Sequence, residues 1–208
     1  MSEMDESNLN ASEEAAPVRK RPRPGERRQQ ILQTLASMLE QPGAERVTTA
    51  SLAARIGVSE AALYRHFASK AQMFEGLIDF VDQSVIGLIR QVTDREPVGP
   101  NQAARILALL IQFAEKNPGM CRVMTGDALV LEHERLQERI NLLFDKIESQ
   151  LRQSLRETNA ASATPTVDTQ VQASVLVAFM QGRLQRFVRS GFKRLPSEHL
   201  QVALTRML

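Results

Sequence analysis

Apolar residues recur at intervals of three and four positions along most of this chain, and this spacing constrains the fold more than any other feature of the sequence. The pattern is clearest in residues 74–92, and it returns in residues 127–157 and 167–190. A period near 3.6 residues gathers apolar side chains on one face of an α-helix. Residues 102–115 are apolar on nearly every side, which indicates a helix buried inside a bundle. Since no segment makes a convincing strand, the sequence predicts an all-α protein.

Capping residues and helix breakers place the ends of the predicted helices. A first helix over residues 26–40 is stopped by proline and glycine, and a second begins near Thr48, a good N-cap residue. A third, short helix covers residues 60–67. Ser69 begins the fourth, and Gln72 three positions later completes a capping-box pattern. The remaining helices are predicted over residues 102–115, 120–125, 127–157, 167–190 and 197–208.

Charge and composition divide the chain into a tail, a head and a body. Residues 1–25 lack apolar periodicity and are interpreted as a disordered tail, acidic at first and then basic. Residues 26–72 form the three-helix head, and residues 73–208 form a larger helical body with an Ala/Ser/Thr-rich linker at 158–166. The net charge is only +2, yet residues 17–70 hold ten Lys or Arg against four Glu. A basic head fits a phosphate-binding surface, or else a charge run that only aids solubility.

A segment of the head, residues 48–67, fits a helix-turn-helix. Gly57 supplies a turn conformation that a residue with a Cβ resists, and Ala53 is small where the two helices approach each other. The core of this unit is expected to consist of Leu52, Ala53, Ile56, Val58, Leu63 and Phe67. The second helix then offers its N-terminus and one face to the major groove of DNA. The run Ala-Ala-Leu-Tyr-Arg-His-Phe-x-Ser-Lys over residues 61–70 strongly resembles the helix-turn-helix of the TetR family.

The TetR resemblance implies a DNA-facing surface on the head. It places on or near that surface Ser59, Ala61, Ala62, Tyr64, Arg65 and His66. It also places three residues where hydroxyl, backbone N–H or ammonium groups contact phosphates, namely Thr48, Thr49 and Lys70. Two of these residues have structural alternatives, since the Tyr64 ring can pack against the head and His66 can cap its helix. Glu60 would repel phosphate, so we expect it to face away or to contact a base amino group.

The body resembles one branch of the TetR family, the nucleoid occlusion factors. The likeness is carried by residues 115–119, 125–129, 135–144 and 182–190. The resemblance implies a cytoplasmic, nucleoid-associated protein that binds palindromic sites on double-stranded DNA and inhibits assembly of the division GTPase FtsZ over the nucleoid. The alternative is a TetR-type transcriptional repressor that responds to a small ligand. A ligand pocket needs convergent polar groups, and the helix over residues 102–115 offers only Gln112 in its middle.

Catalytic, metal and cofactor sites find no support in the sequence. The three histidines, His66, His133 and His199, are scattered, with no pair four residues apart and no cluster with cysteine. The single cysteine, Cys121, excludes an intramolecular disulfide and lies among apolar residues, so we expect a buried, inert thiol. No apolar run reaches the ~18 residues of a transmembrane helix. We therefore expect a protein that is not an enzyme and has no cofactor, metal or membrane segment.

The predicted helix over residues 167–190 is expected to form a homodimer interface. It carries apolar positions on more than one face, which is more than the core of one subunit needs. The small residues Ala173, Ala178 and Gly182 allow a second helix to approach closely. The sequence thus predicts a two-fold dimer in which this helix joins a four-helix interface.

An aromatic residue of the fourth helix suggests a second protein surface. Phe80 lies far from the apolar stripe of that helix, so it either packs against a second element or stands exposed. Exposed aromatics with neighbouring cations are common anchors of protein interfaces. The second possibility therefore makes Phe80, Lys116 and Asn117 a candidate partner-binding surface near the junction of head and body.

Overall fold

The computed structural model of the protein describes residues 25–41, 46–156 and 165–208. All regular structure within these ranges is helical, which confirms the predicted all-α class. In chain order the helices are α1 (Glu26–Leu39), α2 (Thr49–Ile56), α3 (Glu60–Tyr64), α4 (Lys70–Thr93), α5 (Pro100–Lys116), α6 (Pro118–Met124), the 3-10 turn η1 (Asp127–Leu129), α7 (Glu134–Ser154), α8 (Pro165–Arg189) and α9 (Leu200–Met207). The predicted tail, except for its last residue, and most of the predicted linker lie outside the described residues.

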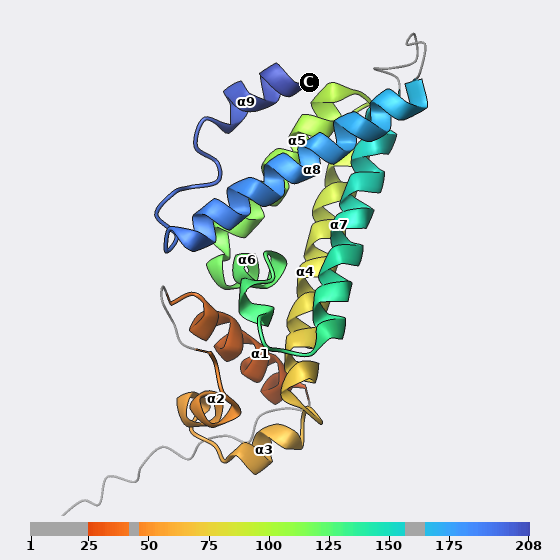
Figure 1. The fold of residues 1–208 in the computed structure, drawn as a ribbon. Helices are drawn as coiled ribbons and strands as arrows, with labels where there is room; N and C mark the ends of the chain where they lie inside the picture. The colour runs from red at the N-terminus through yellow and green to blue at the C-terminus, as the bar shows by residue number, and fades with distance from the viewer. Residues whose placement is uncertain (1–24, 42–45, 157–164) are drawn as a thin grey trace, which may run out of the picture.

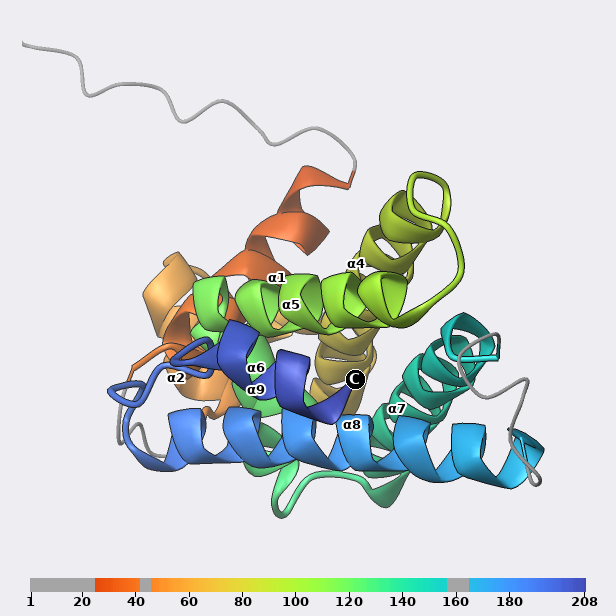
Figure 2. The same cartoon turned by 90° about the horizontal axis from the view of Figure 1, so that it is seen from above.

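The helices form an elongated molecule with the head at one end (Figure 1). The first three helices gather at that end, and α4 leaves the head and runs into the body beside α7. With 24 residues, α4 is about 36 Å long at ~1.5 Å per residue, enough to belong to both parts. Seen from above in Figure 2, α8 forms one outer face of the body. The head is therefore built onto the end of a helix that the body also uses.

One continuous hydrophobic core joins the head to the body. From α1 it contains Ile31 and Leu35, and it continues through α4, α6 and α7 to α8. Head and body approach each other closely at Gly119 in α6, where an added Cβ would lie 2.3 Å from the carbonyl oxygen of Ala36 in α1. Only a glycine permits this distance, so the body packs directly on the backbone of the head.

Three prolines that the sequence pattern treats as helix breakers are in fact the first residues of helices. They are Pro100 in α5, Pro118 in α6 and Pro165 in α8. Proline suits this position because its fixed φ is already helical and its missing N–H would have no partner within the helix. These helices therefore each begin two residues earlier than predicted.

The prediction of one long helix over residues 127–157 is wrong at its start. Gly126 adopts a left-handed conformation with φ of 75°, η1 follows, and Leu131 is again left-handed with φ of 66°. The regular helix α7 begins only at Glu134. The break turns Glu132 toward the head, where its carboxylate meets two cations. A long-range ion pair thus overrides a local helical pattern.

Two details of the head also differ from expectation. The third helix ends at Tyr64 and not at residue 67. The chain tightens there, since the His66 N–H bonds to the Leu63 carbonyl three residues back at 2.9 Å, and the Phe67 N–H shares the same carbonyl at 3.1 Å. The tight turn brings the Phe67 ring into the core, where it is buried. At α4, the predicted Ser69 cap forms, but the side chain of Gln72 accepts from the Ala68 N–H instead of completing the box at Ser69.

Candidate nucleic-acid interface and partner groove

Caps and a left-handed glycine hold the helix-turn-helix in shape. Thr48 Oγ1 accepts a hydrogen bond from the Ser51 N–H at 3.0 Å, and Ser51 Oγ accepts one from the Thr48 N–H at 3.0 Å. Gly57 ends α2 with φ of 78°, as the turn requires. At the start of α3, Ser59 Oγ accepts from the Ala62 N–H at 3.3 Å. These bonds fix where α2 ends and where α3 begins.

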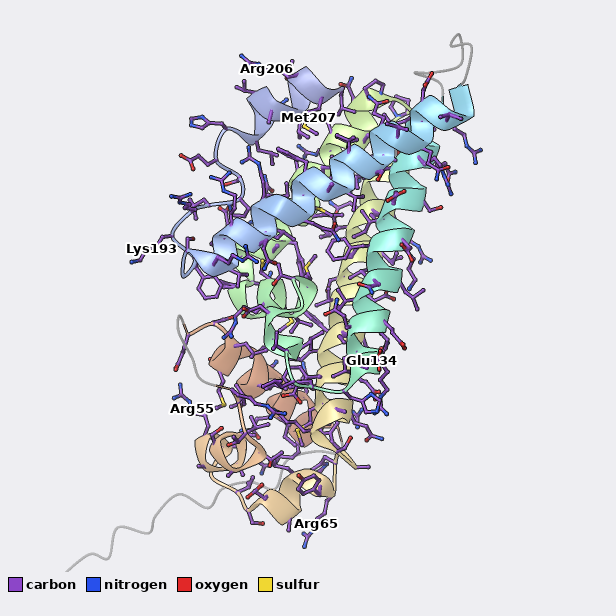
Figure 3. The ribbon with its side chains drawn as sticks, in the orientation of Figure 1. Arg55, Arg65, Glu134, Lys193, Arg206 and Met207 are labelled. Atoms are coloured by element: carbon purple, nitrogen blue, oxygen red, sulfur yellow. The ribbon has the colours of Figure 1, made fainter. Side chains whose placement is uncertain are left out.

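The exposed face of the head carries most of the residues predicted to meet DNA. Beneath it, four predicted core residues are buried, Leu52, Ala53, Leu63 and Phe67, while Ile56 and Val58 are partly buried. Exposed on this unit are Ser59, Ala61, Tyr64, Arg65 and His66, and partly exposed are Thr49 and Ala62. Tyr64 is 46% exposed, so its ring stands largely at the surface. In Figure 3, Arg65 projects from the end of the head that is farthest from the body.

Two of the predicted phosphate contacts are occupied by carboxylates of the protein itself. Thr49 Oγ1 donates to Glu60 Oε2 at 2.6 Å, which turns the Glu60 carboxylate toward α2. Lys70 Nζ donates to Glu132 Oε1 at 2.5 Å, and the Lys70 side chain is mostly buried. A phosphate must therefore compete with Glu132 for this ammonium group.

Sequence reasoning missed Arg28, which braces the end of α3. Its guanidinium carbon lies 4.0 Å from the centre of the Phe67 ring, and its Nη1 donates to the carbonyl of His66 at 2.8 Å. The side chain of His66 remains exposed, whereas its backbone carbonyl accepts the hydrogen bond from Arg28. The only signal for Arg28 in the sequence was its place in the basic run at the start of α1.

A groove of about 300 Å³ lies where α1 of the head meets α4 and α6 of the body. Phe80, 51% exposed, and Asn117 both line it, so the structure brings these two predicted residues together. Lys116, the last residue of α5, is exposed but does not line the groove. The groove also takes in residues that the sequence did not indicate, including Leu32 and Ala36 of α1.

The outer face of α8 carries an apolar stripe. Val167, Val171 and Val175 recur every four residues and are each more than half exposed. Gly182 continues the stripe, and nothing lies within 4 Å of a Cβ built on it. Ala173, in contrast, is buried in the core of its own subunit, so it does not contribute to this face as predicted.

The cysteine is buried, as predicted. Burial raises the pKa of the Cys121 thiol to about 12, with a smaller contribution from the charge of Asp127. The thiol therefore stays protonated at neutral pH. Within the part of the chain that the structure describes, no group of three or more His, Cys, Asp or Glu could hold a metal ion. The described helices also include none that is both long and apolar enough to cross a membrane.

A helix-turn-helix head on an all-helical body defines a class of DNA-binding regulators, and comparisons with known proteins identify the family. Residues 31–77 match the family of bacterial regulatory proteins called tetR. Residues 101–207 match the SlmA-like family, described as a tetracyclin repressor-like C-terminal domain. Both parts of the chain thus match the same class.

Solved structures show the same fold at low sequence identity. The fatty acid degradation regulator FadR from Bacillus halodurans has a TM-score of 0.72 at 14% identity, covering 89% of this chain and 96% of that one. The TetR family regulator PfmR from Thermus thermophilus has a TM-score of 0.69 at 19% identity, covering 87% and 95%. Such likenesses establish the fold alone.

Curated relatives are much more similar in sequence. The nucleoid occlusion factor SlmA of Idiomarina loihiensis is 52% identical over 83% of this chain and 89% of its own. That of Photobacterium profundum gives the same figures, and that of Vibrio cholerae is 51% identical over 82% and 88%. The chain therefore belongs to the SlmA family of nucleoid occlusion factors, a branch of the tetR family.

Proposed function

We propose that this protein binds palindromic DNA as a homodimer at the nucleoid and inhibits assembly of FtsZ there. The observation that carries the proposal is the position of the groove. It is lined by α1 of the head and by α4 and α6 of the body, so a partner held there contacts the DNA-binding unit itself. Membership of the SlmA family supplies the biological setting, and the geometry supplies a surface on which DNA binding and partner binding can meet.

DNA recognition is assigned to the exposed face of α3. Arg65 stands at the end of the molecule, next in sequence to the exposed Tyr64. A helix presented in this way can enter a major groove. The N-terminus of α2, capped by Thr48, flanks this face and suits a phosphate because its N–H groups point outward. In a two-fold dimer the two heads read half-sites about one helical turn apart.

Dimerisation is assigned to the outer face of α8. The valines form an exposed apolar stripe with a glycine at one end, and exposing such a surface to water is unfavourable. A second copy of the same helix can bury it. Packing of α8 on its symmetry mate is isologous, because each copy presents the same residues to the other. The dimer then holds both heads at a fixed separation.

FtsZ binding is assigned to the groove around Phe80. The half-exposed ring forms an apolar anchor beside Leu32, and Asn117 and the exposed Lys116 provide polar and cationic groups near its edge. Aromatic anchors of this kind carry much of the free energy of protein binding. A peptide segment with an apolar anchor residue fits a groove of this size.

The test is an FtsZ polymerisation assay by light scattering, with this protein, in the presence and absence of palindromic DNA. We expect Phe80→Ala to lose inhibition while DNA affinity and dimerisation stay unchanged. Leu142→Ala is the matched control, since Leu142 is 58% exposed on α7 and does not line the groove. Equal inhibition by both variants contradicts the assigned groove, and no inhibition by the wild type contradicts the proposed function.

The ligand-responsive repressor is the alternative for this fold, and the interior of the body does not favour it. Four side chains of α5 are at most 1% exposed and fill the centre of the bundle, namely Ile106, Leu107, Leu110 and Ile111. Gln112, the one polar residue in the middle of this helix, is exposed and does not face the interior. The buried side chains of Gln102 and Ser154 form a hydrogen bond with each other, in which Ser154 Oγ donates to Gln102 Oε1 at 2.6 Å. A repressor of this kind would leave FtsZ polymerisation unaffected.

A further inference from the structure

A single carboxylate of the body binds two cations of the head. Glu132 Oε1 accepts from Lys70 Nζ at 2.5 Å and from Arg46 Nε at 3.0 Å. The Glu132 side chain is 6% exposed, whereas that of Arg46 is 54% exposed. Glu132 is therefore held in place from both sides, and it raises the pKa of Arg46, mainly through their hydrogen bond. Buried carboxylates rarely lack such partners, because desolvation disfavours their charge.

The backbone around Glu132 is shaped to present this carboxylate. Leu131 adopts φ of 66°, a conformation that disfavours residues with a Cβ. Its carbonyl accepts a further hydrogen bond from Arg46 Nη2 at 3.0 Å. Backbone strain of this kind is often found at functional positions, so the strained Leu131 indicates that its contact with Arg46 has a role.

The two cations lie at the places where the head is expected to meet the DNA backbone. Lys70 is the first residue of α4, and Arg46 lies two residues before the Thr48 cap of α2. Helix N-termini are common phosphate-binding positions, and lysine is a common phosphate ligand. One anion, Glu132, thus occupies an ammonium group that a DNA phosphate would also bind.

We infer that Glu132 competes with DNA phosphate for Lys70, and so lowers the affinity of the head for DNA of any sequence. The inference rests on the proposed DNA-binding function. The phosphate contact of Lys70 forms only at the expense of the pair with Glu132. Because a phosphate carries no sequence information, this cost is the same at random and at palindromic sites. Glu132 is thus an affinity-determining residue that does not itself touch DNA.

The test compares two substitutions with the same change of charge, Glu132→Gln and Glu134→Gln. Glu134 is the first residue of α7, is exposed, and lies at the same junction (Figure 3). Both variants gain one unit of positive charge per protomer, but only Glu132→Gln removes the ion pair that holds Lys70. Affinity for a random duplex and for the palindromic site is measured by fluorescence anisotropy over a range of salt concentrations.

For Glu132→Gln we expect the random duplex to bind at least about fivefold more tightly at ~0.1 M salt. The slope of log affinity against log salt should steepen by about 0.9 for each head that gains a phosphate contact. Affinity for the palindrome should rise by a similar factor, because Lys70 contacts a phosphate and not a base, so the specificity ratio stays nearly unchanged. Glu134→Gln should leave the slope as in the wild type. Adding Lys70→Gln to Glu132→Gln should abolish the gain.

A purely structural role for Glu132 gives the opposite result. If the carboxylate only holds the head together, Glu132→Gln weakens binding to both duplexes and lowers the melting temperature, and the inference is overturned. It is also overturned if the two single variants behave alike. Failure of the proposed DNA-binding function is distinct, because the wild type would then prefer no duplex and show no salt dependence.

Discussion

Replacing Gly119 with alanine is expected to push α6 away from α1 and to destabilise the protein. The new Cβ would lie 2.3 Å from the Ala36 carbonyl oxygen and 3.2 Å from Cγ of Glu40, whereas ordinary contacts begin at 3.4 Å. The Ala36 oxygen belongs to the backbone of a helix and cannot rotate aside, so α6 must move by roughly 1 Å. Overpacking of this kind costs about 1–3 kcal/mol. For a chain of this size, that lowers the melting temperature by about 2–12 °C.

Gly87→Ala is the matched control for this experiment. Gly87 lies inside α4, and nothing lies within 4 Å of a Cβ built on it. Alanine stabilises a helix interior by about 0.5–1 kcal/mol relative to glycine, so this variant should melt at or above the temperature of the wild type. Thermal unfolding followed by circular dichroism measures both variants. Equal melting temperatures would refute the argument that α6 packs on the backbone of α1.

Three further predictions concern the head, the dimer and the thiol. Arg65→Ala should weaken DNA binding by at least ~1 kcal/mol, or about fivefold, in anisotropy titrations at moderate salt, and an unchanged affinity would remove Arg65 from the DNA-facing surface. Val171→Glu places a charge in the exposed stripe of α8 and should convert the dimer to a monomer in analytical ultracentrifugation, so a surviving dimer would show that the interface lies elsewhere. Burial raises the pKa of Cys121 from 9.0 to about 12, so the folded state binds this proton more tightly than the unfolded chain. The contribution to stability is therefore present below pH ~9 and is lost as the pH rises toward ~12. In urea denaturation, Cys121→Ala should show a smaller loss of stability than the wild type between about pH 8 and about pH 10.5, and parallel curves would contradict the shift.

Much of the fold follows from local signals that the sequence carries in full. The helix-turn-helix was predictable because Gly57, the Thr48 cap and the Ser59 cap act on residues within four positions of themselves. The loop before α7 was not predictable from such signals. Its shape depends on Glu132 meeting Arg46 and Lys70, which are 86 and 62 positions away in the chain. The pattern of neighbouring residues contains no information about an ion-pair partner so far away in the sequence.

The candidate sites likewise include one that local sequence predicts and one that depends on contacts between distant parts of the chain. The exposed face of α3 follows from a motif, and the structure leaves Arg65 and Tyr64 at the surface. For Phe80, helical geometry alone left two possibilities, packing or exposure. The structure leaves Phe80 51% exposed, as part of the lining of the groove between α1 and α4. The sequence does not indicate that α1 forms one wall of the groove, because Leu32 belongs to an ordinary amphipathic stripe.

The groove and the DNA-binding face share one rigid connection, and this sharing has a thermodynamic consequence. α1 contributes Leu32 to the groove, while Arg28 of the same helix braces α3 through Phe67 and the His66 carbonyl. A shift of α1 on DNA binding would therefore change the proposed groove, and a partner in the groove would change the position of α3. Coupling between two binding sites is reciprocal, so the factor by which DNA changes partner binding equals the factor by which the partner changes DNA binding. If DNA strengthens partner binding, the proposed inhibitor acts where its DNA sites lie, because the partner then also strengthens its binding to that DNA.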